Sequence, residues 1–203
     1  MLTIRKWVHI TPRGAVVDGT PVSIRPTEDP LLVALYRQRT GNYPKFFKMD
    51  PLCRVGFIAS ELLLEGEPER FEPREDRAVV LFSHSGSFAS DSHYEQTIAD
   101  PEGFYPSPAI FVYTLANILT GEIAIRNRYY GETACYLLER NKRETMAATV
   151  REALLDSTTR SVLCGWADSP DAECFEAALF LVESSDRGLE WNEESIDKIM
   201  NER

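Results

Sequence analysis

A thiol is the first group in this sequence that could do chemistry. The stretch GEIAIRNRYYGETACYLLERNKRE, residues 121–144, contains the tripeptide Thr133-Ala134-Cys135. A cysteine acts as a nucleophile when a helix N-terminus or a nearby cation lowers the pKa of its thiol. The function of the protein therefore depends on whether Cys135 has such surroundings, because a cysteine within a strand is usually an inert apolar side chain.

A serine and a group of possible metal ligands offer two further sites. The stretch FSHSGSF, residues 82–88, has a superficial likeness to a Gly-x-Ser-x-Gly nucleophile elbow around Ser85, but Ser83 replaces the first glycine and the downstream acid and histidine are out of order. We favour a turn of small residues. His84, Asp91 and His93 fit no standard zinc spacing, so we expect solvated side chains, no metal and no cofactor.

Positive charge gathers in one segment of an acidic chain. The whole chain has 22 Lys and Arg against 32 Asp and Glu, a net charge of −10, which disfavours nucleic acids and anionic membranes as partners. Residues 126–143 nevertheless carry a net charge of +3. The cations of this segment are Arg126, Arg128, Arg140, Lys142 and Arg143. Such a patch can dock an acidic partner or a phosphate, and a solvated helix end is the alternative interpretation.

Composition indicates one compact domain in a reducing compartment. With 203 residues, of which 43% are hydrophobic, the chain is long enough for a single buried core. The cysteines show no Cys-x-x-Cys spacing, the first residues lack the apolar centre of a signal peptide, and no run is long enough to span a membrane. We therefore expect a cytoplasmic, soluble protein.

Hydrophobic patterns predict the elements that position these groups. The first half of the chain predicts a hairpin with an Asp18-Gly19 turn, a helix over 50–66, a buried strand over 77–83 and a loop over 84–107. The second half predicts a helix buried on all sides over 108–126 and a helix over 143–156. Strands over 161–167 and 174–184 and a charged helical tail over 186–203 complete the pattern. This order predicts an α/β layer with a parallel core.

Several stretches, in this order, resemble the N-terminal half of a β-ketoacyl synthase, a condensing enzyme of the thiolase-like superfamily. They are KFFKMDPLCRVGFIASELLL, RAVVLFSHSGSF, FYPSPAIFVYTLANILTGEIAIRNRYYGET, RSVLCGWADSP and EAALFLVE, within residues 43–183. The most specific match is to the family's Phe-x-x-x-x-x-Asn-x-x-x-Gly-x-x-x-Ile pattern, with Asn117 and Gly121 in place. The resemblance implies half of a thiolase-like fold, with a mixed, mostly parallel sheet packed with helices, in a single domain over 1–203.

The resemblance places arginine where the family has its nucleophile. Nine residues after Gly131, and about twenty-five before Gly165, both lead to position 140, which is Arg140. Cys135 comes five residues too early, in the strand that leads to the elbow. The two histidines that the family uses belong to its C-terminal half, and His9, His84 and His93 all lie upstream and match neither.

These departures imply a subunit that is not catalytic alone. The resemblance implies a role in bacterial fatty-acid or polyketide-type biosynthesis as an accessory subunit, a homodimer or the partner of a true synthase, with an acyl carrier protein as a possible further partner at the basic segment. We expect the apolar faces of residues 108–126 and 144–156 to be exposed in one half alone and to form the interface. The alternatives are an active 3-oxoacyl-[acyl-carrier-protein] synthase or acyltransferase that uses Cys135, and a binding module for acyl or coenzyme A groups.

Overall fold

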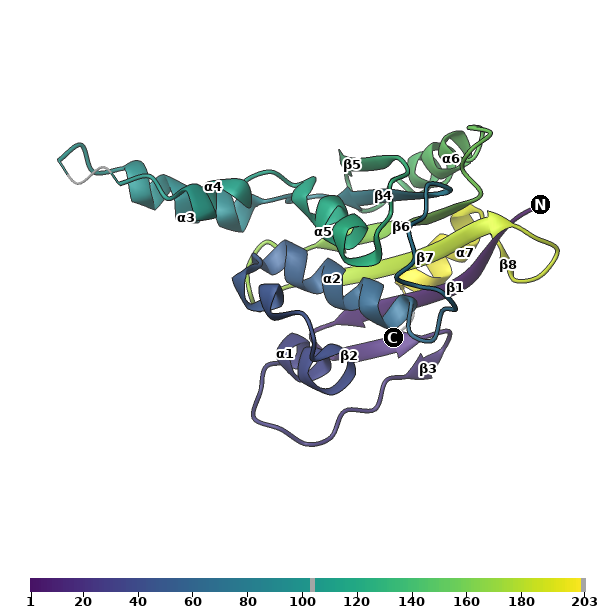
Figure 1. Ribbon diagram of the computed structural model, residues 1–203, viewed down its shortest axis with the longest axis horizontal. Helices are drawn as coiled ribbons and strands as arrows, with labels where there is room; N and C mark the ends of the chain where they lie inside the picture. The colour runs from purple at the N-terminus through teal and green to yellow at the C-terminus, as the bar shows by residue number, and fades with distance from the viewer. Residues whose placement is uncertain (103–104, 202–203) are drawn as a thin grey trace.

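A computed structural model describes residues 1–102 and 105–201, which form one mixed sheet with helices on both faces (Figure 1). The strands are β1 (Leu2–Thr11), β2 (Gly14–Val17), β3 (Thr20–Pro21), β4 (Arg77–Ser83), β5 (Thr133–Leu137), β6 (Ser161–Asp168), β7 (Glu176–Ser184) and β8 (Leu189–Glu190). The helices are α1 (Leu31–Leu35), α2 (Pro51–Leu63), α3 (Phe88–Ile98), α4 (Pro108–Val112), α5 (Ile118–Asn127), α6 (Arg143–Ala153) and α7 (Glu193–Met200), with a π-helix at Tyr36–Thr40 and a 3-10 helix at Pro44–Lys48.

The sheet separates two hydrophobic cores. Its strand order is β3-β2-β1-β7-β6-β4-β5, and β8 pairs with β1. Val79 and Leu81 of β4 face a core that α1, α2 and α5 cover, whereas Val80 and Phe82 face a second core under α6 and α7. This alternation is what a strand buried on both faces requires, so the prediction of a fully buried strand over 77–83 is confirmed.

The fold class is confirmed, but the balance of strand directions is not the expected one. Only the pairs of β4 with β5 and with β6 are parallel, whereas β1 pairs antiparallel with β2, β7 and β8, and β6 pairs antiparallel with β7. The physical reason is the short connections, because β1–β2 and β6–β7 are hairpins without a crossover helix. The predicted turn is present, since Asp18 and Gly19 both adopt positive φ between β2 and β3.

Helix α2 begins and ends close to where its sequence predicts. The carboxylate of Asp50 accepts a hydrogen bond from the backbone N–H of Cys53, and Pro51 takes the first helical position. The helix packs most of its surface against β1, β6 and β7 and against α5. Gly66, with positive φ, follows the end of the helix.

The predicted loop over 84–107 contains a helix, α3. Polar side chains occur on every face of α3, its few apolar residues form no stripe, and Ser90 is the one that is buried, so no amphipathic pattern marks this helix in the sequence. Residues 103 and 104 of the same stretch, and the last two residues of the charged tail, lie outside the described residues. Of the rest of that tail, residues 193–200 form α7, as predicted, whereas residues 189–190 form the short strand β8.

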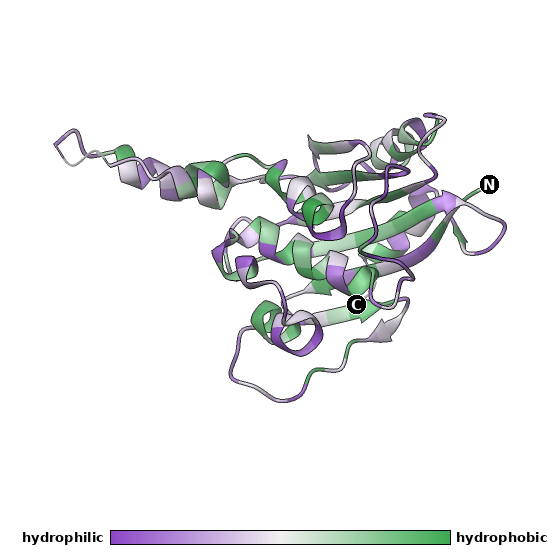
Figure 2. Cartoon of the chain, viewed as in Figure 1, coloured by the Kyte–Doolittle hydropathy of each residue, from purple (hydrophilic) through white to green (hydrophobic). Residues whose placement is uncertain are grey.

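The predicted helix over 108–126 is broken and is not buried on all sides. It divides into α4 and α5 around residues 113–117, where the hydroxyl of Thr114 donates a hydrogen bond to the carbonyl of Phe111. None of the α4 side chains is buried. Helices α3 and α4 lie side by side and project from the body as an arm, on which apolar residues are visible among polar ones (Figures 1 and 2).

The apolar face of α6 is not exposed, which corrects the expectation for residues 144–156. Met146, Ala147 and Val150 are buried against the sheet and α7. The indole N–H of Trp191, which precedes α7, donates a hydrogen bond of 3.1 Å to the carbonyl of Ala147. The chain thus covers α6 with its own C-terminal helix and leaves the arm uncovered.

Candidate functional site at the carboxyl ends of the parallel strands

The carboxyl ends of β4, β5 and β6 meet at one edge of the sheet. The turn after β4, the segment 138–143 after β5, called here the elbow, and Asp168 at the end of β6 all lie there. Open α/β sheets hold their ligands outside the carboxyl ends of parallel strands, so this edge is the natural place for a site. The side chains found there decide what chemistry is available.

Arg140, at the expected nucleophile position, is held in an ion-pair cluster. Its guanidinium donates to both carboxylate oxygens of Glu176, at 2.7 and 2.6 Å, and to the carbonyl of Met200 at 2.7 Å. His9 contacts the same carboxylate at 3.0 Å. The cluster joins the elbow to β1, to the start of β7 and to the C-terminal end of α7, where a cation is favourable. Arg140 therefore acts as a structural clamp and offers no nucleophile.

The pairing of Arg140 changes the pKa values of the charged groups around it. Burial alone would raise the pKa of Glu176, but the hydrogen bonds and charges of Arg140 and His9 outweigh burial and lower that pKa to about 2. Arg143, the first residue of α6, is buried and lies 3.4 Å from a carboxylate oxygen of Asp197. Burial, and then the charge of Arg140, lower the pKa of Arg143. Two of the three cations of the elbow, Arg140 and Arg143, are thus paired with carboxylates.

Cys135 lies within β5, as the sequence predicts, and lacks both features that activate a thiol. It pairs with Leu81 of β4 in the middle of the strand, five residues before Arg140. The side chain is half-buried, and burial raises the pKa of the Cys135 thiol. A raised pKa leaves less thiolate at neutral pH, so the surroundings of this cysteine oppose a nucleophilic role.

The five cations of the predicted basic patch do not share one surface. Arg126 and Arg128 lie beyond the amino end of β5, and Arg140, Lys142 and Arg143 lie beyond its carboxyl end. The guanidinium of Arg126 donates to both oxygens of the buried Glu61, each at 3.1 Å. Within the described residues, only Arg128 and Lys142 of the five make no ion pair. Acids distant in sequence neutralise the others, which local counting of charges cannot reveal.

The turn after β4 is a structural turn, as predicted. One carboxylate oxygen of Asp168 accepts hydrogen bonds from the hydroxyls of Ser83 and Ser85, both at 2.8 Å, and from the backbone N–H of His84. No histidine side chain joins this cluster in the described part of the chain. His84, Asp91 and His93 are exposed, and residues 1–102 and 105–201 contain no cluster able to hold a metal.

A second group of cations was missed by the sequence analysis. Lys45 and Lys48 are exposed on the 3-10 helix before α2, and Arg54 in the first turns of α2 donates a hydrogen bond to the carbonyl of Phe47 at 3.0 Å. We call Lys45, Lys48 and Arg54 the basic surface. The hydroxyl of Ser90, in the helix that follows β4, donates a hydrogen bond of 3.0 Å to the carboxylate of Asp50 at the start of α2, so this surface lies toward the carboxyl end of β4. Residues 45–54 contain these three cations and one acid, Asp50, and this local excess of positive charge could have indicated the basic surface from the sequence.

Exposed apolar side chains continue from the end of β5 onto the arm. They are Phe88, Phe111, Val112, Leu115, Tyr136 and Leu137. Strand β5 is an edge strand, with a partner on one side only, and Leu137 is 63% exposed. A Cβ atom at Gly86 would lie 3.1 Å from the Leu137 side chain and 3.4 Å from Ala116, so β5, the turn after β4 and the root of the arm adjoin one another. Leu137 and the root of the arm thus form one apolar strip, and Tyr136 extends it around the edge of β5 to the face on which Tyr136 stacks on Phe82. Contiguous exposed apolar surface marks an interaction site.

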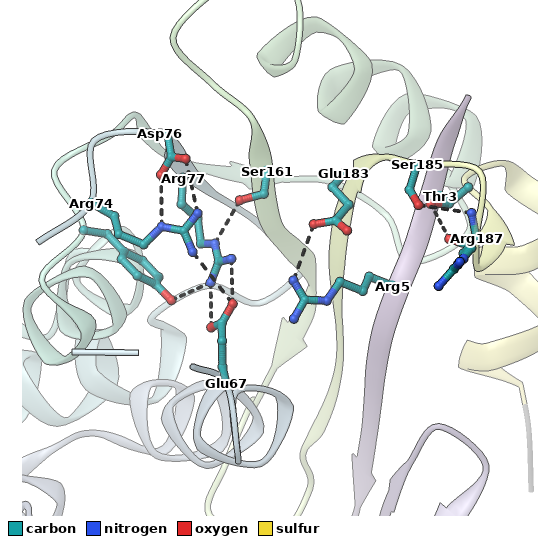
Figure 3. Close-up of polar contacts among 11 residues, drawn as sticks. Thr3, Arg5, Glu67, Arg74, Asp76, Arg77, Ser161, Glu183, Ser185 and Arg187 are labelled. Carbon is teal, nitrogen blue, oxygen red and sulfur yellow. Dashed lines mark hydrogen bonds and ion pairs between the residues drawn. The ribbon is translucent and has the colours of Figure 1, made fainter. Parts of the chain in front are cut away.

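The opposite end of the same strands is closed (Figure 3). Arg77, at the start of β4, donates to both oxygens of Glu67 at 2.8 Å, to the hydroxyl of Tyr129 at 2.8 Å and to the hydroxyl of Ser161 at 3.0 Å. Arg74 pairs with Asp76 beside it. Burial alone would raise the pKa of Glu67, but Arg77 and neighbouring arginines lower it. This end has a structural function.

The fold of this chain, and not its sequence, is what known proteins match. No family model and no curated protein matches the sequence. Solved structures do match, and they show the thiolase-like fold of ketosynthases, as the resemblance implied. No helix in residues 1–102 and 105–201 is long and apolar enough to cross a membrane.

Particular structures give the extent of this likeness. The ishigamide ketosynthase/chain length factor matches with a TM-score of 0.67 and 18% identity over 92% of this chain and 63% of that one. A ketosynthase in complex with its chain length factor from Xenorhabdus doucetiae matches with a TM-score of 0.60 and 16% identity over 91% of this chain and 79% of that one. A β-ketoacyl synthase from Burkholderia phymatum matches with a TM-score of 0.59 and 11% identity over 91% and 59%. The chain thus spans 63% of the first of these.

Proposed function

We propose that this protein is a non-catalytic, ketosynthase-like subunit that pairs with a synthase chain of the same fold in bacterial fatty-acid or polyketide-type biosynthesis. The observation that carries the proposal is Arg140, which stands at the expected nucleophile position and is engaged on Glu176 and Met200. A side chain in a clamp of this kind cannot attack a thioester. Two of the similar structures hold a ketosynthase together with a chain length factor, which supports a paired assembly.

The apolar strip is the surface on which we place the partner. Strand β5 presents unpaired backbone N–H and C=O groups along its outer side, and exposed edge strands of this kind add a further strand readily. Tyr136 and Leu137 flank that edge, and the arm continues the apolar surface beyond it. A partner strand on β5, with its neighbouring helices over the arm, would remove the apolar strip from water. A synthase chain is the occupant we propose, and a second copy of this chain is an alternative outcome of the test.

An acidic carrier protein is the further partner, and the basic surface suits it better than the segment 126–143. Lys45 and Lys48 are exposed and lie on one short helix, whereas Arg128 and Lys142 lie at opposite ends of β5. Complementary charge steers association and fixes orientation, so a cluster is more effective than separated cations. The role of the subunit is then to shape the chamber of its partner or to recruit the carrier.

The test of catalysis is the intact mass of the purified protein after incubation with acyl and malonyl thioesters on carrier protein. We expect no adduct from a protein that remains folded by circular dichroism. An adduct that disappears in Cys135→Ala would overturn the proposal and establish a condensing or acyl-transfer enzyme. Cys174→Ala is the matched control, because Cys174 is an exposed thiol outside β5.

A further inference from the structure

A buried carboxylate lies between the basic surface and the root of the arm. Glu122 of α5 is 3% exposed, and one of its oxygens lies 2.6 Å from the ammonium of Lys45. The same oxygen accepts a hydrogen bond of 3.4 Å from the hydroxyl of Tyr113. The other oxygen is buried and has no hydrogen-bond partner in the part of the chain that the structure describes. Lys45 is therefore the ionic partner on which this carboxylate depends.

These contacts join separate elements. Lys45 belongs to the 3-10 helix Pro44–Lys48, and Tyr113 directly follows α4 and begins the arm root, residues 113–117. Although burial would lower the pKa of Lys45, its hydrogen bond to Glu122 raises that pKa. The Lys45 side chain nevertheless remains 45% exposed, so a group in solution can reach its ammonium.

We propose that the Lys45–Glu122 ion pair is a latch, in which an acidic partner bound at the basic surface competes for Lys45 and loosens the root of the arm. A buried carboxylate that loses its counter-ion is strongly disfavoured, so Glu122 turns toward water and gives up the hydrogen bond from Tyr113. Binding and loosening are linked, and each must affect the other to the same extent. The inference rests on the proposed function, because it requires an acidic partner at the basic surface.

The test combines peptide binding with amide hydrogen exchange. The probe is a fluorescein-labelled peptide of ten glutamates, and its affinity is measured by fluorescence anisotropy at low salt. In the wild-type protein, bound peptide should speed exchange in residues 113–117. Glu122→Gln releases Lys45 and leaves no buried charge, so we expect about tenfold tighter peptide binding and an exchange rate in the arm root that bound peptide no longer changes. Lys48→Ala should weaken peptide binding and leave exchange in the free protein unchanged.

A second variant separates the latch from a general loss of folding. Tyr113→Phe removes the link to the arm but keeps the Lys45–Glu122 pair. Exchange in the arm root should therefore rise and bound peptide should no longer change it, while peptide should bind slightly tighter, because binding no longer breaks the Tyr113 hydrogen bond. The inference is overturned if Glu122→Gln binds the peptide no tighter than the wild-type protein does. It is also overturned if bound peptide leaves exchange in the arm root of the wild-type protein unchanged, or if the wild-type protein binds no peptide. Assembly with a synthase chain is measured separately at β5, so the failure of the latch and the failure of the proposed pairing are distinguishable.

Discussion

At its amino end, β4 begins with Arg77, which is 1% exposed and whose donors are taken up by Glu67, Tyr129 and Ser161. The elbow at the opposite edge holds Arg140, whose side chain is 40% exposed and lies near uncovered apolar residues. Both arginines are paired with acids, so the presence of an ion pair does not distinguish structure from function. The difference is that the chain completes its packing at the amino end and leaves it incomplete at the carboxyl end.

The same contrast separates two helices. Helix α2 is almost wholly buried by the sheet and α5, whereas α4, which is comparably apolar, has no buried side chain. An apolar helix in water is costly, so α4 implies a surface supplied by another molecule. The comparison predicts that substitutions at the amino end lower the free energy of unfolding, and that substitutions at the edge of β5 lower affinity for a partner.

Arg77→Met should have the largest effect on stability. It removes both hydrogen bonds that Arg77 donates to the buried carboxylate of Glu67, whose other ion pair, with Arg74, is longer at 3.8 Å. Breaking a buried pair costs about 3–5 kcal/mol. Urea denaturation followed by circular dichroism measures the loss. Arg74→Met is the matched control, because Arg74 is more exposed and should cost less than about 1 kcal/mol. Equal losses in both variants would contradict the view of a closed network centred on Arg77.

Leu137→Asp should affect association and spare stability. The side chain is 63% exposed, so the free energy of unfolding should change by no more than about 0.5 kcal/mol. A carboxylate buried in an interface is unpaired, and we expect affinity for the synthase chain to fall about 100-fold by biolayer interferometry. Leu155→Asp is the control, since Leu155 is 81% exposed at the end of α6, away from β5. Unchanged affinity for Leu137→Asp would place the interface elsewhere.

Arg140→Gln should have a moderate, pH-dependent effect. The pKa of Glu176 is lowered to about 2 in the folded protein from an ordinary value of 4.5, so its pairing stabilises the fold above pH 4.5 and this contribution is lost as pH falls toward 2. We expect the variant to lose about 1–2 kcal/mol at pH 7, and the difference from wild type to shrink below pH 4. Lys142→Gln removes a cation at the start of α6 that makes no ion pair within residues 1–102 and 105–201, and it should cost nothing. A loss independent of pH would contradict the clamp.

Cys135→Ala should have the smallest effect. The thiol is half-buried in β5, so its removal should change the free energy of unfolding by about 1 kcal/mol and leave the affinity for a synthase chain unaltered. Thermal denaturation and the same binding assay measure both quantities. A large loss of any acyl-transfer activity in this variant would show that the elbow position does not decide catalysis.

Local signals predicted the elements whose neighbours lie in the same chain. The Asp50-Pro51 start and the apolar stripe fixed α2, and continuous apolar runs identified β4 and β6. Helix α3 was missed because it has no apolar stripe, and the helix over 108–126 was predicted as buried because sequence cannot show what covers an apolar face. Spacing alone placed Arg140 between the end of a strand and the start of a helix, and it lies between β5 and α6.

Long-range pairing explains most of what the sequence could not provide at the site. Glu176 and Met200, which hold Arg140, and Glu61, which holds Arg126, are distant in the chain, so local charge suggested one basic patch where there are two separated groups. The parallel core was overestimated for a related reason, because β7 turns back on β6 and inserts between β6 and β1.

The proposed pairing with a synthase chain is tested most directly by sedimentation velocity. The tagged protein is purified from its host and studied at micromolar concentration, and the masses of all chains are determined. We predict a complex of two chains of ketosynthase-like fold, and we predict that the Leu137→Asp variant sediments as a folded monomer. A monodisperse wild-type monomer, with no second chain recovered, would contradict it.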